Sequence, residues 1–220
     1  LLKILPLPKI IHSVELYADI ILPIALQPLT YLMHIDADII AEDLGDITED
    51  VVKLVEEKNL ITAVGFQDRY LDLMDMIKEE LPKHKSGGLV YGAWVGGIPG
   101  VWWWQKKSTC GGQLVEQNIH LLDGLRWLFG EAKSIYAVSS RGIVEPGVTA
   151  KPEYDTDDYS VCLITFENNV TATLTSSCYS RGVRPSCGLH ITLPEVVIDY
   201  HLRNNVTLEY ADKTIDIKRN

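Results

Sequence analysis

Hydrophobic and polar residues follow a helical period from about residue 48 onward, the first part of the chain with a clear pattern. A polar capping segment at residues 48–50 precedes apolar residues that recur at helical spacing over 51–58. The apolar run 60–65 is typical of a buried parallel strand, and a second helix is predicted over 71–81. A helix followed by a buried strand predicts a parallel sheet covered by helices.

The spacing of hydrophobic residues changes to a period of two after residue 130. Before that point the sequence predicts a strand over 91–97 and a long helix over 112–129, and Gly130 suits the left-handed end of that helix. Strand-like alternation then recurs in six segments: Ser134–Val144, Asp158–Glu167, Val170–Tyr179, Leu189–Leu193, Val196–Leu202 and Val206–Tyr210. Consecutive strands joined by short turns predict an open antiparallel sheet.

These patterns divide the chain into two units of different class. Residues 1–65 are predicted to form part of an α/β unit with a parallel sheet, although the apolar fragments of 1–47 match neither period cleanly. Residues 66–220 are predicted to form an α+β unit whose open sheet is mainly antiparallel. Because such a sheet leaves one face uncovered, we expect a homo-oligomer that packs through the strands between 158 and 210.

Composition narrows the classes of partner. A chain of 220 residues with 46% hydrophobic residues can bury one good core or two modest ones. The formal net charge of −10 argues against a broad basic surface, so we expect neither nucleic acid nor membrane partners. The four cysteines form no C-x-x-C pair and no spacing for a tetrahedral metal site, which favours buried thiols in a reducing cytoplasm and no bound metal.

The predicted helix 112–129 has two distinct faces. At about 100° per residue, Glu116, His120, Asp123 and Trp127 fall within an arc of roughly 60°. The opposite side is apolar and is predicted to face the core; it carries Leu114, Leu121, Leu125, Leu128 and Phe129. A solvated polar face is the simplest explanation of such a pattern, and a His–carboxylate contact that only stabilises the helix is another.

The surroundings favour a site on this polar face. The Gly111-Gly112 pair permits close approach to the helix start, and residues 102–104 are three consecutive tryptophans. A histidine of near-neutral pKa can accept a hydroxyl proton, and a carboxylate one turn away can orient it. We therefore predict that Glu116, His120 and Asp123 line one cleft together with at least one of these tryptophans.

The segment from Gly111 to Asp123, followed by Trp127-Leu128-Phe129-Gly130-Glu131, resembles the glucose–fructose oxidoreductase and inositol dehydrogenase (Gfo/Idh/MocA) family. In that family a glycine pair precedes an acid, a histidine follows four residues later, and an aspartate and a Leu-Phe-Gly turn close the motif. Residues 64–70 similarly resemble the strand that leaves the family's nucleotide domain, and the match in order and spacing spans about residues 48–210.

The resemblance implies an NAD- or NADP-dependent oxidoreductase that transfers hydride from a hydroxyl carbon of a sugar, polyol or related compound. It implies an incomplete Rossmann-like domain over 1–65 and a substrate-binding, catalytic domain over 66–220. By resemblance His120 is the proton acceptor, and Glu116, which stands where the family commonly has Asp, positions the substrate. The remaining site candidates are Asp123, Trp103, Trp104, Lys106 and Gln117 for the substrate, with Lys107 as a further basic residue, and Arg69 and Tyr70 for the cofactor.

The chain departs from the family pattern in two places. It contains no G-x-G-x-x-G turn, and its nearest counterpart to the family's Glu-Lys-Pro, Glu42-Asp43-Leu44, lacks both Lys and Pro. A sugar-sensing or scaffold relative with a decayed nucleotide half therefore remains an alternative. A hydrolase that uses Glu116 and His120 is a more distant one, because no nucleophile or metal set accompanies them.

Overall fold

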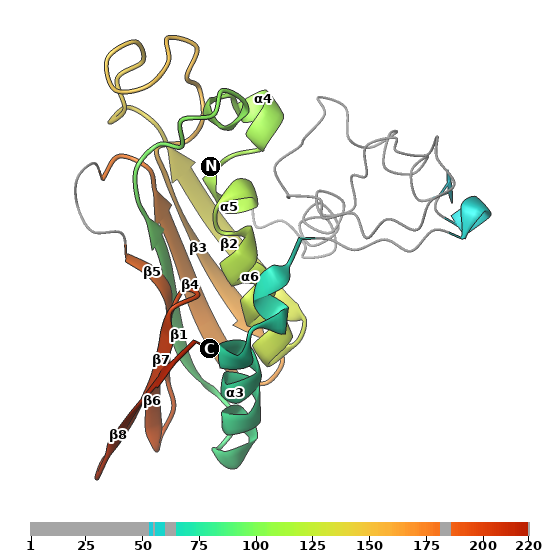
Figure 1. Ribbon diagram of the computed structural model, residues 1–220, viewed down its shortest axis with the longest axis vertical. Helices are drawn as coiled ribbons and strands as arrows, with labels where there is room; N and C mark the ends of the chain where they lie inside the picture. The colour runs from blue at the N-terminus through green and yellow to red at the C-terminus, as the bar shows by residue number, and fades with distance from the viewer. Residues whose placement is uncertain (1–52, 55, 60–64, 181–185, 220) are drawn as a thin grey trace.

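A computed structural model describes residues 53–54, 56–59, 65–180 and 186–219 (Figure 1). Residues 56–58 are helical and Asn59 follows in a turn with φ of 48°, as predicted for the end of the first helix. The predicted strand 60–65 falls outside the described residues except for Gly65. The predicted α/β unit over 1–65 and its boundary therefore stay predictions.

A mixed sheet forms the centre of the described structure. Its eight strands lie in the order β2-β3-β4-β1-β5-β6-β7-β8. Their bounds are β1 Gly88–Val95, β2 Ala132–Ser140, β3 Tyr159–Phe166, β4 Val170–Ser177, β5 Ser186–Thr192, β6 Val196–His201, β7 Asn205–Tyr210 and β8 Thr214–Lys218. All neighbouring pairs are antiparallel except β1 and β4, which run parallel. The prediction of an α+β unit with an open, mainly antiparallel sheet is confirmed.

The period-two patterns produce these strands because alternate side chains enter the core. In β4 and β6, buried residues alternate with half-buried ones along almost the whole strand. The strand β8 was not predicted, since it has only five residues and most of them are exposed. Gly188 allows β5 and β6 to approach closely: its φ is +149°, and a Cβ atom there would lie 1.8 Å from the carbonyl oxygen of Tyr200.

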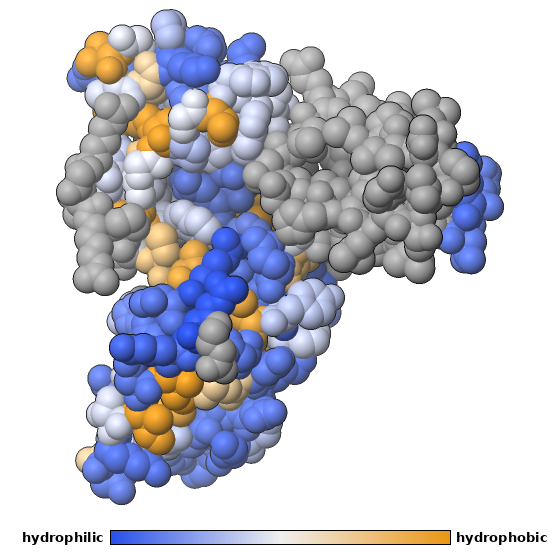
Figure 2. Space-filling model, viewed as in Figure 1, coloured by the Kyte–Doolittle hydropathy of each residue, from blue (hydrophilic) through white to orange (hydrophobic). Residues whose placement is uncertain are grey.

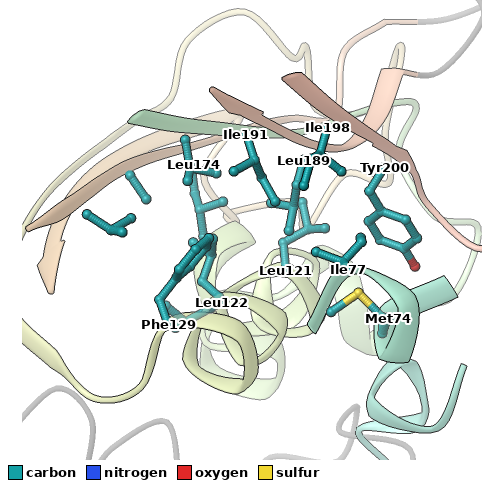
Figure 3. Close-up of a cluster of buried hydrophobic side chains, with 14 of the residues drawn as sticks. Met74, Ile77, Leu121, Leu122, Phe129, Leu174, Leu189, Ile191, Ile198 and Tyr200 are labelled. Atoms are coloured by element: carbon teal, nitrogen blue, oxygen red, sulfur yellow. The ribbon is translucent and has the colours of Figure 1, made fainter. Parts of the chain in front are cut away.

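Helices cover one face of the sheet (Figure 1). Their bounds are η1 Gln67–Tyr70, α3 Asp72–Glu80, η2 Leu81–Lys83, η3 Trp103–Gln105, α4 Lys107–Cys110, α5 Gln113–Glu116 and α6 Ile119–Phe129. Figure 3 shows side chains of α3 and α6, among them Ile77 and Leu121, pointing at Leu189 and Ile191 of β5. Because these side chains are at most 3% exposed, this packing removes most of the apolar surface of both layers from water.

The long helix predicted over 112–129 is interrupted. It consists of α5 and α6, separated at Gln117 and Asn118. The N–H of Asn118 donates to the carbonyl oxygen of Gln113, five residues back, at 3.1 Å. This wider loop resembles a π-bulge, which inserts a residue and rotates the following turn. A continuous helical wheel across residues 112–129 was therefore wrong, although Gly130, with φ of +85°, ends α6 as predicted.

The carboxylate of Asp158 accepts several hydrogen bonds from the loop between β2 and β3. Strand β2 ends at Ser140, short of the predicted Val144, because Gly142 turns the chain with φ of +122°. The Oδ2 atom of Asp158 accepts hydrogen bonds from the backbone N–H groups of residues 142–144 at 2.7, 2.6 and 2.9 Å. The hydroxyl of Tyr154 donates to Oδ1 at 2.9 Å. The loop thus depends on one fully buried acceptor.

Replacing Asp158 with Asn should destabilise the fold in a pH-dependent way. Burial alone would raise the pKa of this carboxyl group, but the backbone N–H groups and the Tyr154 hydroxyl outweigh burial and lower it below 3.8. A lowered pKa contributes stability above the unfolded value, about 3.9, and this contribution is lost as the pH falls through the folded value. We expect a loss of about 1 to 3 kcal/mol at pH 7 that shrinks below about pH 4.

Chemical denaturation of both proteins from pH 3 to 8 measures this difference. The exposed Glu153 lies in the same loop, and Glu153→Gln serves as the control that should change little. A gap for Asp158→Asn that stays constant across this pH range would contradict the assignment of the stabilising interaction to the ionised carboxylate.

The face of the sheet opposite the helices carries both apolar and polar side chains. Leu89 and Tyr91 of β1 and Val161 and Leu163 of β3 are each more than 40% exposed. They alternate with buried residues that point to the helices.

In Figure 2 hydrophobic patches lie between hydrophilic residues on the side of the molecule that is turned to the viewer. Among the described residues no helix has the length and apolar character needed to cross a membrane.

Candidate functional site

Glu116 is tied to the tryptophan loop. It closes the short helix α5, and the indole N–H of Trp104 donates to its Oε2. Trp104 is fully buried and packs with Val144, Tyr154 and Cys178 in a second, smaller core. Because the indole is fixed in this core, its N–H holds the carboxylate in one orientation. The structure thus brings Glu116 into contact with the tryptophan loop, and the burial of Trp104 gives this residue a supporting place behind the carboxylate. A cleft lined by Glu116, His120 and Asp123 together stays a prediction.

His120 lies in the first turn of α6 and is half-buried. Its ring stacks on that of Trp94 in β1, with centroids 6.0 Å apart and an angle of 29° between the planes. Trp94 is an inward-facing residue of the central strand, so the imidazole lies between the helix layer and the sheet. Sequence reasoning missed this partner, since only the pairing of β1 with its neighbours shows which way Trp94 faces.

Asp123 binds Arg69. The guanidinium donates from Nε to Oδ2 at 2.7 Å and from Nη2 to Oδ1, and the carboxylate is only 3% exposed. The hydrogen bond to Asp123 raises the pKa of Arg69 above its ordinary value, although burial opposes this. The structure thus joins a residue predicted to contact substrate to one predicted to contact cofactor.

The other predicted site residues differ in exposure. Trp103 is half-buried, Lys106 is exposed, and the predicted cofactor residue Tyr70 is 84% exposed. The Nζ atom of Lys107 lies 2.8 and 3.1 Å from the two carboxylate oxygens of Asp157. This ion pair occupies the Lys107 ammonium group and connects α4 to the chain just before β3.

The glycine pair permits a close approach, as predicted. Gly111 and Gly112 have φ values of 72° and 110°, both in the region that favours glycine. A Cβ atom on Gly112 would lie 2.7 Å from Oδ2 of Asp157. The start of α5 therefore accommodates the carboxylate that Lys107 holds, and a larger residue at 112 would displace it.

The bulge between α5 and α6 buries amide atoms that lack hydrogen-bond partners among the described residues. Asn118 is fully buried, and within this part of the chain neither its Oδ1 nor its Nδ2 has a partner. The Oε1 atom of Gln117, a predicted substrate residue, is in the same condition, and Gln117 is 7% exposed. Leaving a buried amide unsatisfied costs about 1 to 3 kcal/mol, so such groups call for an explanation. Asn118 was not predicted, because a helical wheel gives no sign of a bulge.

None of the four cysteines has the lowered thiol pKa that a nucleophilic cysteine needs. Burial raises the pKa of the thiols of Cys110, Cys178 and Cys187, and that of Cys162 to about 12. All four are free thiols. A raised pKa keeps a thiol protonated at neutral pH, and the thiolate is the nucleophile. These cysteines therefore lend no support to the hydrolase alternative.

Known proteins share this architecture. The chain is 23% identical over 197 residues to the levoglucosan dehydrogenase of Pseudarthrobacter phenanthrenivorans, a match that covers 78% of this chain and 50% of that protein. A structure of levoglucosan dehydrogenase in complex with NADH and levoglucosan superposes with a TM-score of 0.65 at 20% identity. It is matched over 79% of this chain and 51% of that chain.

A second sugar dehydrogenase has the same fold. The UDP-N-acetylglucosamine 3-dehydrogenase of Acidithiobacillus ferrooxidans superposes with a TM-score of 0.59 at 15% identity, over 80% of this chain and 52% of that chain. The chain thus spans about half the length of the relatives that it matches. The family model of the GFO/IDH/MocA C-terminal domain matches residues 88–193, which contain the central strand, the helices α5 and α6 and the motif around His120. Residues 88–193 therefore resemble the C-terminal domain of the GFO/IDH/MocA family in sequence.

Proposed function

We propose that the protein containing this chain is a nicotinamide-dependent dehydrogenase of a sugar or sugar-like alcohol, and that this chain supplies its substrate side. The observation that supports this most strongly is the composition of the bulge between α5 and α6. Within residues 116–120 it brings together a carboxylate held by Trp104, a half-buried imidazole, and buried amide atoms of Gln117 and Asn118 that have no hydrogen-bond partner among the described residues. Amides and carboxylates are the usual partners of sugar hydroxyl groups, and the imidazole is a suitable base.

In this mechanism His120 accepts the proton of the hydroxyl group that is oxidised. Trp94 limits the rotation of the imidazole by stacking on it. Glu116 accepts a hydrogen bond from a neighbouring hydroxyl group and orients the substrate, while Trp104 keeps the carboxylate in place. The buried Oε1 atom of Gln117 and the buried amide of Asn118 can gain partners from further hydroxyl groups of the substrate. Trp103 and Lys106, which precede this segment in the chain, stay further substrate candidates.

The residues described here fit one half of a nicotinamide site. NAD or NADP, when bound, accepts the hydride that leaves the same carbon as the proton. Two sugar dehydrogenases of the same fold, one of them in complex with NADH, support this proposal. Arg69 and Tyr70 lie within five residues of the end of the predicted Rossmann-like domain, and we propose them as cofactor candidates for this reason. The four free thiols fit a reducing compartment, so we place the protein in the cytoplasm.

An assay of the full-length protein tests this function. The protein is incubated with NAD or NADP and a panel of sugars, anhydrosugars and polyols, and reduction of the cofactor is followed at 340 nm. Turnover with at least one member of the panel is the expected result. Binding of a sugar in calorimetry without any reduction of either cofactor would favour the non-catalytic sugar sensor instead.

The uncovered face of the sheet is the proposed oligomer interface. The register places Leu163 of β3, Thr173 of β4 and Tyr91 of β1 in one row across the sheet. Leu89 and Val161 extend this apolar area, and all four of its apolar members are more than 40% exposed. Burying such side chains is favourable, and a flat sheet face can pack on a second copy of itself about a twofold axis. We therefore propose a homodimer through this face.

Substituting Leu163 with Lys should break this dimer. A lysine in the middle of the interface would be buried without a partner, so the dimer dissociation constant should rise about tenfold or more. Sedimentation velocity across a concentration series measures the change. Thr214→Lys, at the exposed edge strand β8, is the control. Equal association of both variants and the wild type would place the interface elsewhere.

A further inference from the structure

The segment where the chain enters the described unit is held by two ion pairs that point in different directions. Asp68 and Arg69 are consecutive residues of the short helix η1. Arg69 binds Asp123 in the middle of α6. Asp68, only 3% exposed, accepts a hydrogen bond from Nε of Arg203 at 2.7 Å, and Arg203 lies in the turn between β6 and β7. The entry segment is thereby joined to both the helix layer and the sheet.

Aromatic rings fix the plane of the Arg69 guanidinium. Its central carbon lies 5.7 Å from the ring centroid of Phe66 and 5.2 Å from that of Trp127, one turn beyond Asp123 on α6. Trp127 also contacts Lys78 of α3, whose Nζ atom lies 3.2 Å from the ring centroid. A guanidinium that donates two hydrogen bonds to one carboxylate and lies over aromatic rings has a defined orientation. Arg69 is thus a rigid connection between η1 and α6.

We propose that Arg69 and Asp123 are positioning residues for the dehydrogenase reaction proposed above, on which this inference rests. His120 lies in the same helix, one turn before Asp123. The chain before residue 65 is predicted to carry the cofactor, and it enters the described unit through η1. The ion pair between η1 and α6 therefore sets how the hydride acceptor lies relative to the carbon whose hydroxyl group faces His120. Asp123 acts through Arg69 in this arrangement and has no direct contact with substrate.

The expected signature of a positioning role is a loss of turnover without a loss of affinity. Misplacing reacting groups by about 1 Å can cost about 100-fold in rate. In the full-length protein, Arg69→Lys and Asp123→Asn should each lower kcat by about 10- to 100-fold. A lysine keeps the charge but cannot form the paired hydrogen bonds. Both KM values should stay within about twofold, because in the proposed arrangement the two side chains bind each other and not a ligand.

Two further measurements separate positioning from a merely structural role. The primary deuterium isotope effect on kcat with deuterated substrate should increase in both variants, since hydride transfer becomes slower than the other steps. The double variant should lose little more than either single variant, because both changes remove one interaction. The matched control is Arg126→Lys, which alters a two-oxygen ion pair with Glu131 at the other end of the same helix. It should leave kcat and the isotope effect unchanged.

Other outcomes would overturn the proposal. A rise in the substrate KM of Asp123→Asn alone would indicate direct substrate contact, and a rise in the cofactor KM of Arg69→Lys alone would indicate direct cofactor contact. If kcat falls only in proportion to the fraction of folded protein and the isotope effect is unchanged, the ion pair contributes to folding and has no role in positioning. If the wild type shows no turnover, the proposed function fails, and amide hydrogen exchange of residues 65–71 then tests the connection itself. Exchange should be faster in Asp123→Asn than in Arg126→Lys, and equal rates would refute the connection.

Discussion

Replacing His120 with alanine in the full-length protein should lower the turnover of alcohol oxidation by about 100- to 10,000-fold, the usual contribution of general-base catalysis. Cofactor affinity should remain nearly unchanged, because His120 lies on α6 against Trp94 of the sheet and no phosphate-binding turn is near it in sequence. An imidazole ordinarily titrates at about pH 6 to 7, so kcat/KM of the wild type should rise with pH through that range. This rise should disappear in the variant.

Loss of the stacking with Trp94 could also disturb the fold, so the comparison needs further variants. His120→Gln retains a planar polar group and should be as inactive as the alanine variant while unfolding at the wild-type temperature. His201→Ala removes an exposed histidine on β6 and should keep both turnover and pH profile. Wild-type turnover in His120→Ala, or loss of cofactor binding before loss of turnover, would show that another group accepts the proton.

Replacing Gly188 with alanine should destabilise the fold by about 2 to 6 kcal/mol. The substitution places a Cβ atom 1.8 Å from the carbonyl oxygen of Tyr200, and φ at this position is +149°. Backbone strain costs about 1 to 3 kcal/mol, and overpacking adds about 1 to 3 kcal/mol. The contact is with backbone rather than with a flexible side chain, so relief requires β5 and β6 to separate.

Urea denaturation measures this effect. Gly100→Ala is the matched control, since a Cβ atom there has no neighbour within 4 Å and its φ lies outside the range that favours glycine. The control should differ from the wild type by less than about 0.5 kcal/mol. A similar small change for Gly188→Ala would mean that β5 and β6 are paired differently from the register described.

The sheet could be predicted from sequence because each strand buries alternate residues. The strands around Ala172 and Ile198 show this period over almost their whole length, and their neighbours follow after short turns. Edge strand β8 lacks a buried face, which removes the signal. The parallel pairing of β1 with β4 could not be predicted, because a strand pattern specifies which face is buried and says nothing about which distant strand lies beside it.

The candidate site was predictable only as far as it is local in sequence. The spacing from Glu116 to His120 identified the segment, but the bulge at Asn118 changes how the two residues are oriented and has no periodic signature. The partners Trp104, Trp94 and Arg69 come from other elements, and only the tryptophan loop gave a hint in sequence. Side-chain hydrogen bonds between elements depend on tertiary placement, which periodicity does not encode.

The central position of β1 has a consequence for synthesis on the ribosome. This strand leaves the ribosome before any other strand of the sheet, yet it pairs with residues 170–177 on one side and 186–192 on the other. It must therefore remain without a strand partner until residues 170–177 have emerged. Pairings between residues so distant in sequence form slowly, and unpaired strand edges associate with other chains in the meantime. Nascent chains that end before residue 170 should need a chaperone to stay dispersed.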